Sequence, residues 1–278
     1  MPWFPELSTT STYSQPAAMQ VDVVPFYEGI LGIPPHGLVA SWAVEPHLDD
    51  PRGGAVRGRA ELVAWAEQTR AWLGEGGATV RPVYLLKTAS RTVEEVVLEL
   101  TVNGERRDLP VATVAERETD GRLTAIRIYH SLWPLIEGHV VRAPLLARVP
   151  GLAAPDVVGD YQRALAAGDL EAVLACYEDD AVVREPAGGP YRYTGMDELR
   201  HIYGLQFADG AGIPLEHCTI TDDGRACALE YNVVRWGHTP MTPQPGIAVY
   251  ERGDSGKLAY GRIDDDAAPP EASDSSKR

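Results

Sequence analysis

Two acidic residues stand directly before a proline in similar loops, and their placement favours proton-transfer chemistry. Glu185 begins the loop Glu-Pro-Ala-Gly-Gly, and Asp50 begins the loop Asp-Pro-Arg-Gly-Gly. A residue before proline is held extended, and Glu185 ends an apolar strand, so its carboxyl group can point into a protein interior. Burial there raises a carboxyl pKa toward values that suit a general acid or base. The alternative for both residues is a solvated carboxylate at a strand end.

A histidine and a run of aspartates are further candidates. His217 can exchange protons near neutral pH, although a single histidine on a strand also serves structural roles. Glu216 and His217 point to opposite faces of their strand, so only one of them can lie inside. The run at 264–266 resembles a metal site, but consecutive strand residues cannot all face one ion, which favours a charged domain end. The sequence holds no nucleophile elbow, phosphate loop, zinc spacing or dinucleotide fingerprint, and we expect neither cofactor nor metal.

The chain carries two copies of one unit. Four collinear pairs of similar segments support a tandem duplication. They are DVVPFY at 22–27 with DVVGDY at 156–161, the two acidic loops at 50–54 and 185–189, VLELTV at 97–102 with ALEYNV at 228–233, and VAERETDGRLTAIRI at 114–128 with VYERGDSGKLAYGRI at 249–263. We therefore expect an N-terminal extension (1–19), a first domain (20–138), a docked linker (139–155), a second domain (156–268) and a disordered tail (269–278).

The second copy shows the elements that must position these residues. Apolar residues at three- and four-residue steps predict a helix from Asp156, a break at Gly168-Asp169 and a second helix after it. Another helix is expected near 196–205. Apolar and turn patterns predict strands at 181–184, 215–221, 226–235, 246–252 and 258–264. Helices followed by long antiparallel strands indicate an α+β fold.

Strand alternation separates residues that line a pocket from residues that do not. Leu229, Tyr231 and Val233 share one face, and Glu230 lies on the other. Glu99 aligns with Glu230 in the pair of segments given above. We expect both glutamates on the outer face of a sheet or in a contact between the two domains.

Two further positions correspond on the last strands of the two copies. His130 and Asp265 are in phase with Ile128 and Ile263, respectively. We expect His130 and Asp265 either at the mouths of the pockets or at the surface.

Composition narrows the class of protein. The chain has 278 residues and a formal net charge of −15, so it repels rather than gathers a phosphate backbone, and nucleic acid is not an expected partner. No apolar run is long enough to cross a bilayer, and the first residues lack the pattern of a secretion signal. Three cysteines without metal-ligand spacing fit a reducing compartment. We expect a cytoplasmic protein without membrane contact.

The stretch YQRALAAGDLEAVLACYEDDAVVREPAGG, which begins at Tyr161, resembles a known family. Its Ala-Gly-Asp-Leu turn, its aromatic-x-Asp-Asp-Ala strand entry and its acidic-Pro-x-Gly loop are similar to those of the ketosteroid isomerase and SnoaL-like polyketide cyclase branch of the nuclear transport factor 2 (NTF2) superfamily. The resemblance implies two tandem cone-shaped domains, each with helices packed on a curved antiparallel sheet. It also implies an internal pseudo-dimer and allows a homo-oligomer of such chains.

The resemblance also implies site residues. It places Tyr161 and Tyr27 at the position of the family's oxyanion-donating tyrosine, although each also fits a buried core tyrosine. Glu185 and Asp50 fall at the position of its proton-shuttling acid. The family's second oxyanion donor, a protonated aspartate, falls on Ala248 and Thr113, a departure that leaves an enolate with only one donor of the family's pair. Tandem epoxide-opening cyclases of polyether biosynthesis are similar in architecture, and their second acid falls near Glu216 and His217.

The function that the resemblance implies is a cofactor-independent acid/base enzyme. It would act on an apolar small molecule as an isomerase, a cyclase or an epoxide-opening hydrolase, in secondary metabolism. Glu185 would relay a proton, Tyr161 would stabilise an oxyanion, and His217 would return or orient a proton. The expected substrate-binding residues are Leu229, Tyr231, Val233, Ile263, Asp265 and His130. The alternatives are a non-catalytic binding or assembly module, and a division of labour in which the first domain is only structural.

Overall fold

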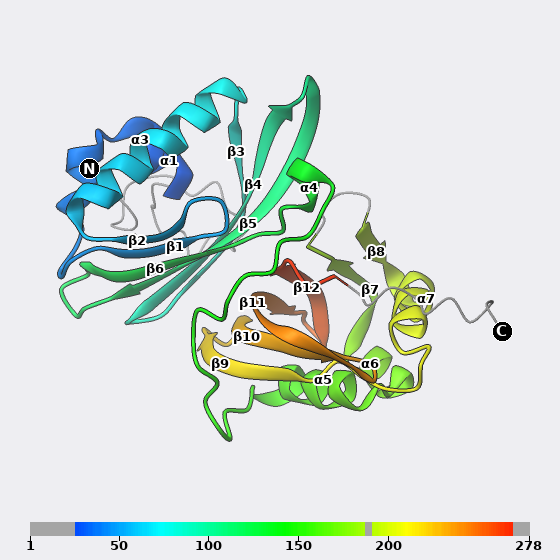
Figure 1. The fold of residues 1–278 in the computed structure, drawn as a ribbon. Coiled ribbons are helices and arrows are strands. Elements are labelled where there is room, and N and C mark those ends of the chain that lie inside the picture. Colours follow the sequence, from blue (N-terminus) through cyan, green and yellow to red (C-terminus); the bar gives the residue numbers. More distant parts are fainter. Residues whose placement is uncertain (1–25, 187–190, 269–278) are drawn as a thin grey trace.

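The computed structural model describes residues 26–186 and 191–268. These residues form two six-stranded sheets with helices beside each of them (Figure 1). The expected N-terminal extension, the start of the first domain at 20–25, Gly188 and Gly189 of the second acidic loop, and the tail at 269–278 lie outside the described residues. No helix in the described part of the chain is long and apolar enough to cross a membrane.

The first half contains one of these sheets, and most helices of this half precede its long strands. Its elements are α1 (Phe26–Gly32), α2 (Pro35–Val39), β1 (His47–Asp50), β2 (Gly54–Arg57), α3 (Arg59–Glu75), β3 (Thr79–Lys87), β4 (Arg91–Val102), β5 (Glu105–Arg117), β6 (Leu123–Tyr129) and the short α4 (Trp133–Ile136). The strand order is β2-β1-β6-β5-β4-β3, and only the contact between β1 and β6 is parallel.

The second half repeats this plan. Its elements are α5 (Asp156–Ala167), α6 (Leu170–Ala175), β7 (Tyr177–Arg184), β8 (Arg192–Thr194), α7 (Gly195–Gln206), β9 (Leu215–Asp222), β10 (Ala226–Trp236), β11 (Thr239–Arg252) and β12 (Leu258–Asp265). The strand order β8-β7-β12-β11-β10-β9 matches that of the first sheet, with β7 parallel to β12. The expected α+β fold with two tandem domains is confirmed, and each sheet is antiparallel except for this one contact.

The turn between α5 and α6 follows from two residues. Gly168 ends α5 with a φ of 71°, a left-handed conformation that glycine adopts without strain. A side chain there would collide with the backbone of Ala211 and Gly212. Asp169 then caps α6, because its carboxylate accepts a hydrogen bond from the backbone N–H of Ala172 at 3.1 Å. The predicted break between the two helices is therefore confirmed.

The strand registers correct one part of the repeat alignment. Glu95 lies opposite Ala112 in the first sheet, and Glu230 lies opposite Ile247 in the second. The counterpart of Glu230 is therefore Glu95, not Glu99. The error arose because apolar residues alternate along every strand, so that two strands can be aligned at several even shifts with similar apparent quality.

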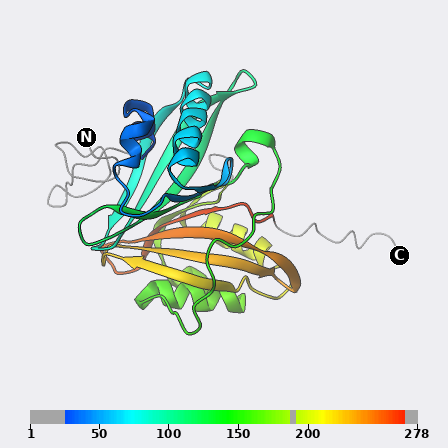
Figure 2. The ribbon, with the colours of Figure 1, turned by 60° about the vertical axis from the view of Figure 1, so that its left-hand side comes forward.

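The two sheets pack face to face, with their helices on the two outer sides (Figure 2). Apolar side chains from both sheets form one cluster between them. Its buried members are Tyr84, Leu86, Val93, Ala112, Val114, Tyr129, Ala226, Ala228, Ile247 and Val249. The two halves thus share a core, which gives the expected internal pseudo-dimer.

Two buried ion pairs cross this contact in corresponding positions. Arg127 on β6 binds Glu230 on β10, with a shortest distance of 2.5 Å between Nε and Oε1. Arg262 on β12 binds Glu95 on β4, with 2.7 Å between Nη2 and Oε2. All four residues are at most 7% exposed. Each half therefore supplies one arginine and one glutamate to its neighbour.

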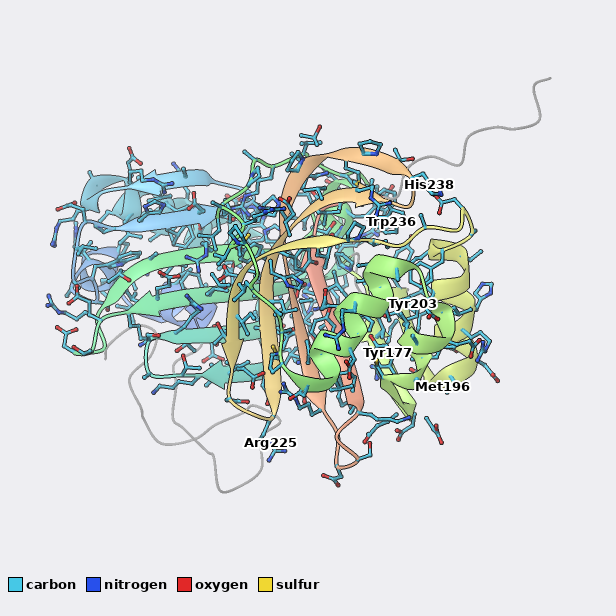
Figure 3. All side chains as sticks on the ribbon, turned by 90° about the horizontal axis from the view of Figure 1, so that it is seen from below. Tyr177, Met196, Tyr203, Arg225, Trp236 and His238 are labelled. Atoms are coloured by element: carbon cyan, nitrogen blue, oxygen red, sulfur yellow. The ribbon has the colours of Figure 1, made fainter. Side chains whose placement is uncertain are left out.

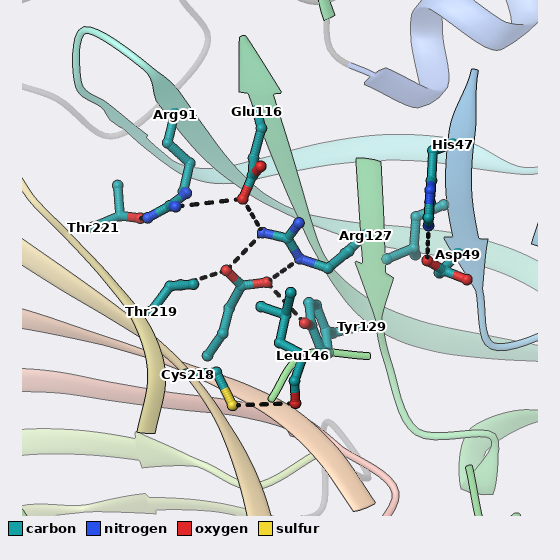
Figure 4. A network of polar contacts seen from close by, with 12 residues as sticks. His47, Asp49, Arg91, Glu116, Arg127, Tyr129, Leu146, Cys218, Thr219 and Thr221 are labelled. Atoms are coloured by element: carbon teal, nitrogen blue, oxygen red, sulfur yellow. Dashed lines mark hydrogen bonds and ion pairs between the residues drawn. The ribbon is translucent and has the colours of Figure 1, made fainter. Parts of the chain in front are cut away.

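Glu230 is held in its charged form by several donors (Figure 4). Burial disfavours its charge, but Arg127 and the hydroxyl groups of Thr219 and Tyr129 outweigh burial and lower its pKa. Glu99, in contrast, lies near the surface and pairs with Arg81 at 2.7 Å. The expectation of a contact between the domains is confirmed for Glu230, and Glu99 lies outside that contact.

The segment that connects the halves lies along the second sheet. The carbonyl oxygen of Leu146 accepts a hydrogen bond from the Asn232 side chain at 3.1 Å. The backbone N–H of Val149 donates to the carbonyl oxygen of His217 on the edge strand β9 at 2.9 Å. These contacts cover an edge that would otherwise expose unpaired backbone groups.

Removal of one partner of a buried ion pair should destabilise the whole molecule. In Arg127→Met, Glu230 loses its guanidinium partner, and we expect the free energy of unfolding to fall by about 3–5 kcal/mol in urea titrations. The double variant Arg127→Met/Glu230→Met should recover much of this loss. Arg81→Met serves as the control, because its ion pair is exposed and should contribute less than about 1 kcal/mol. Equal effects of Arg127→Met and Arg81→Met would contradict this assignment.

Candidate functional site

A cavity of about 950 Å³ lies in the second half, between the sheet and its helices. Its walls are rich in aromatic side chains. The aromatic side chains that line it are Trp133, Tyr161, Tyr191, Tyr193, Tyr203, Tyr231, Trp236 and Tyr250. Figure 3 shows Tyr203 beside Tyr177 in the region between the helices and the second sheet, and Trp236 on β10. The volume is large enough for a drug-sized molecule.

Two carboxyl groups reach this cavity from neighbouring strands. Glu185 directly follows β7, and Asp265 ends β12. Because β7 and β12 are parallel, with Arg184 opposite Arg262, their ends lie side by side. Arg184 points away from the cavity, with its Nη2 atom 2.9 Å from Oδ2 of Asp264. Because neighbouring strand residues point to opposite faces, the next residue, Glu185, points toward the cavity. The expected inward placement of Glu185 agrees with this geometry.

Asp265 has the electrostatics of a proton-transfer group. It is 8% exposed, and it accepts hydrogen bonds from the Tyr231 hydroxyl at 2.8 Å and from the backbone N–H of Ala267 at 3.1 Å. Burial raises the pKa of Asp265 to about 7, although both hydrogen bonds oppose this change, and the nearby charge of Glu185 adds to it. Asp265 can therefore be either protonated or charged at neutral pH.

Glu185 is perturbed in the same direction. Burial raises the pKa of its carboxyl group, although a hydrogen bond from the Gln206 side chain at 3.1 Å and the charge of Arg184 oppose the rise. Two carboxyl groups with raised pKa values in one cavity can hold one proton between them. Such a pair can take a proton from one atom of a ligand and return it to another.

Tyr161 lies in the cavity wall and in the core at once. Its hydroxyl is 2.9 Å from the Tyr203 hydroxyl, which is in turn 2.9 Å from the hydroxyl of Tyr177. Burial raises the pKa of Tyr161 well above its ordinary value, so the hydroxyl stays protonated. The two expectations for Tyr161, a core tyrosine and a donor facing a ligand, are compatible with each other.

His217 lies apart from the residues that line the cavity. The side chain of His217 faces the helices. The Glu216 carboxylate points outward, with its Oε1 atom 3.0 Å from Nη1 of Arg148. However, α5 and the connecting segment enclose the imidazole, with Nδ1 3.3 Å from the carbonyl oxygen of Leu152 and Nε2 3.2 Å from the Gln162 side chain. Burial lowers the pKa of His217. The structure does not bring His217 to Glu185, because β9 is the edge strand and lies beneath α5.

The other expected substrate-binding residues divide between the cavity and the core. Tyr231, Val233, Ile263 and Asp265 line the cavity. Leu229 points the same way but is fully buried in the core. His130 belongs to the first half and does not reach the cavity.

The corresponding residues of the first half pack against neighbouring core side chains. Asp50, the counterpart of Glu185, accepts a hydrogen bond from the indole N–H of Trp65 at 2.9 Å. Tyr27 packs edge-on against Phe26, and it is 3% exposed. His130, the counterpart of Asp265, lies 3.9 Å from Asp50, and burial lowers its pKa. A small cavity of about 80 Å³ beside His130 is too small for a drug-sized ligand.

The three consecutive aspartates take three different partners. Asp264 binds Arg184 between the sheets, and Asp265 accepts from Tyr231 in the cavity. Asp266 accepts from Ser131 at 2.7 Å, and it lies 3.1 Å from His139. Alternation along the strand therefore separates the three carboxylates, and no group of metal-ligating side chains occurs in the described parts of the chain.

Comparison with known proteins identifies the fold of this half. Residues 158–261 match the family model of the SnoaL-like domain. The second half of the chain is a SnoaL-like domain. Together with the repeated strand order, this match is consistent with the tandem architecture expected from the sequence.

Solved structures of single domains are similar to part of the chain. A putative polyketide cyclase from Sinorhizobium meliloti is 24% identical, with 40% of this chain and 94% of that chain covered and a TM-score of 0.34. An NTF-2 like protein of unknown function from Burkholderia xenovorans is 23% identical, with 41% and 85% covered and a TM-score of 0.33. A protein with a ketosteroid isomerase-like fold from Catenulispora acidiphila, in complex with trimethylamine, is 19% identical, with 39% and 84% covered and a TM-score of 0.34. A comparison with curated proteins found no match.

Sequence reasoning missed several residues of the SnoaL-like domain's cavity. Trp133 and His139 line it, although they lie before this domain in the chain, and their rings are 4.9 Å apart. No local pattern indicates them, because their position depends on how the first half packs on the second. Tyr203 and Gln206 on α7 also line the cavity. Tyr203 could have been found, since it lies four residues after Leu199 on the apolar face of the predicted helix.

Replacement of Asp265 should change how stability depends on pH. The folded protein holds the Asp265 proton up to about pH 7, whereas an unfolded aspartate releases it near pH 4. Between these values the folded state binds the extra proton, so this group makes stability fall as pH rises, by about 1.4 kcal/mol for each pH unit. Asp265→Asn removes this contribution, and its stability relative to the wild type should rise with pH in urea titrations from pH 4 to 7. Asp254→Asn, at an exposed position, is the control. Parallel stability curves for wild type and Asp265→Asn would contradict the raised pKa.

Proposed function

We propose that the SnoaL-like domain is a cofactor-independent acid/base enzyme for an apolar small molecule. The observation that carries the proposal is the pair of carboxyl groups, Glu185 and Asp265, with raised pKa values on adjacent strand ends of one aromatic cavity. Isomerisation, ring closure and opening of an epoxide are the reactions that such a pair serves. The match to the SnoaL-like family supports this class of reaction but does not choose among its members.

The proposed isomerisation needs one proton and no other reactant. Glu185, as the carboxylate, takes a proton from the carbon between a carbonyl group and a C=C double bond, and the C–H electron pair forms a conjugated enolate. The enolate oxygen receives a hydrogen bond from protonated Asp265 or from the hydroxyl of Tyr161. Glu185 then returns the proton to a different carbon, and the carbonyl group is restored.

Asp265 offers the second donor that the sequence resemblance did not supply. Ala248, at the expected position of that donor, is a buried core residue with no polar side chain. Asp265 already accepts hydrogen bonds at both carboxyl oxygens, and when protonated it also carries one O–H to donate. A carboxylic acid kept neutral by burial is an effective donor to a developing oxyanion.

The first half has a structural role in this proposal. Trp65 holds the carboxyl group of Asp50, and the surrounding interior is filled by Phe26, Tyr27 and Trp42. The first half instead provides the partner sheet and two residues of the cavity wall, Trp133 and His139. The remaining alternative is a binding protein that uses the same cavity without chemistry.

Replacement of Glu185 tests the proposal directly. Purified protein is incubated in deuterated water with a panel of β,γ-unsaturated ketones and epoxides, and products and deuterium incorporation are followed by mass spectrometry. For any substrate found, Glu185→Gln should lower kcat by a factor of about 10² or more and change KM only slightly. Asp50→Asn should leave kcat unchanged, since Asp50 has no access to a ligand.

The two variants separate the alternatives. A Glu185→Gln protein that retains full turnover would overturn the assignment of Glu185. An equal loss of kcat in Asp50→Asn, measured on folded protein, would overturn the division of labour. Binding of the panel without turnover or exchange would favour the non-catalytic alternative.

A further inference from the structure

The cavity of the SnoaL-like domain has a one-sided set of charges. Glu185, Asp209 and Asp265 line it, whereas none of its described lining residues is a lysine or an arginine. Residues 187–190, next to Glu185 in the sequence, are Ala-Gly-Gly-Pro and carry no charge either. Arginines on the two strands that lead to Glu185 and Asp265 have partners between the sheets, since Arg184 binds Asp264 and Arg262 binds Glu95.

Asp209 adds a fixed negative charge to this cavity. It accepts hydrogen bonds from the backbone N–H groups of His238 at 3.0 Å and of Ala211 at 3.2 Å. These bonds lower the pKa of Asp209, so its carboxylate is charged at neutral pH. An anionic ligand would therefore meet this exposed negative charge, and no lysine or arginine among the described lining residues offsets it.

The aromatic side chains of the cavity also favour a positively charged ligand. Eight tyrosine and tryptophan side chains line the described part of the cavity. The faces of these rings carry negative electrostatic potential, and they attract ammonium groups that have lost much of their water. The neutral and apolar parts of the same ligand would bury surface against these rings and against Leu165, Ile202 and Ile213.

We infer that this cavity binds an apolar organic cation, such as a tertiary or quaternary amine on an aromatic or polycyclic body. The cation compensates Glu185 and Asp265, whose charged forms are costly in a largely apolar cavity whose described lining holds no lysine or arginine. Phosphates, free carboxylates and thioesters of phosphorylated carriers are excluded as ligands by the same charges. The inference rests on the proposed function for its choice of cavity, but it does not depend on proton transfer.

Three probes with one aromatic body and different charges test this inference. They are 2-naphthylmethyl(trimethyl)ammonium, its uncharged isostere 2-(2,2-dimethylpropyl)naphthalene, and the anion 2-naphthalenesulfonate. Affinity is measured with the full chain at pH 8 by equilibrium dialysis. The cation should bind at least tenfold more tightly than its isostere, which corresponds to about 1.4 kcal/mol, and the anion should not reach saturation. Equal affinities for cation and isostere, or no saturable binding of the cation, would overturn the inference.

Variants of the cavity residues test whether the cation binds in this cavity. Asp265→Asn and Glu185→Gln should each lower the affinity for the cation about tenfold and leave the affinity for the isostere unchanged. Asp254→Asn removes an exposed charge that is not part of the cavity lining, and it should leave all affinities unchanged. An undiminished preference for the cation in both cavity variants would overturn the inference.

The result of this binding test can be distinguished from the result of the turnover test of the proposed function. Equal affinities for cation and isostere, together with loss of turnover in Glu185→Gln, would refute the cationic ligand and leave the acid/base enzyme intact. A strong preference for the cation without turnover of any substrate would refute the enzyme and support the cationic ligand.

Discussion

The buried contact between the two sheets decides which side chains reach the cavity. Arg262 and Glu230 point into that contact, where each meets a partner from the first half. Because neighbouring residues on a strand point to opposite faces, Ile263 and Tyr231 must point to the helices. The same alternation turns Arg184 toward the contact, and Glu185 follows it on the cavity side. The ion pairs therefore fix the register on which the proposed chemistry depends.

The two halves share a strand order, but they use their interiors differently. In the first half, tryptophans occupy the space above the sheet, and Trp65 fixes the carboxyl group of Asp50. In the second half, a cavity lies between the sheet and its helices, and Trp133 from outside the domain lines it. This difference is the physical basis on which the proposed function places the chemistry in the second half.

Local patterns predicted the fold and the acid at the strand end, and they were less informative about long-range packing. The Gly168-Asp169 break and the position of Glu185 follow from turn chemistry and from the residue before a proline. His217 was predicted as a partner for Glu185, but edge-strand position and coverage by α5 are not encoded in neighbouring residues. The alignment of Glu99 failed because a period of two residues fits several registers equally well. The role of Trp133 depends on the contact between the halves.

The central claim is that two carboxyl groups in the cavity titrate abnormally, and carbon-13 NMR of carboxyl-labelled protein tests it most directly. Resonances of Asp265 and Glu185 would be assigned from the spectra of Asp265→Asn and Glu185→Gln and followed from pH 3 to 9. The account predicts a midpoint near pH 7 for Asp265 and one above the ordinary range of glutamate for Glu185. Midpoints near pH 4 for both carboxyl groups would contradict it, since solvated carboxylates titrate there.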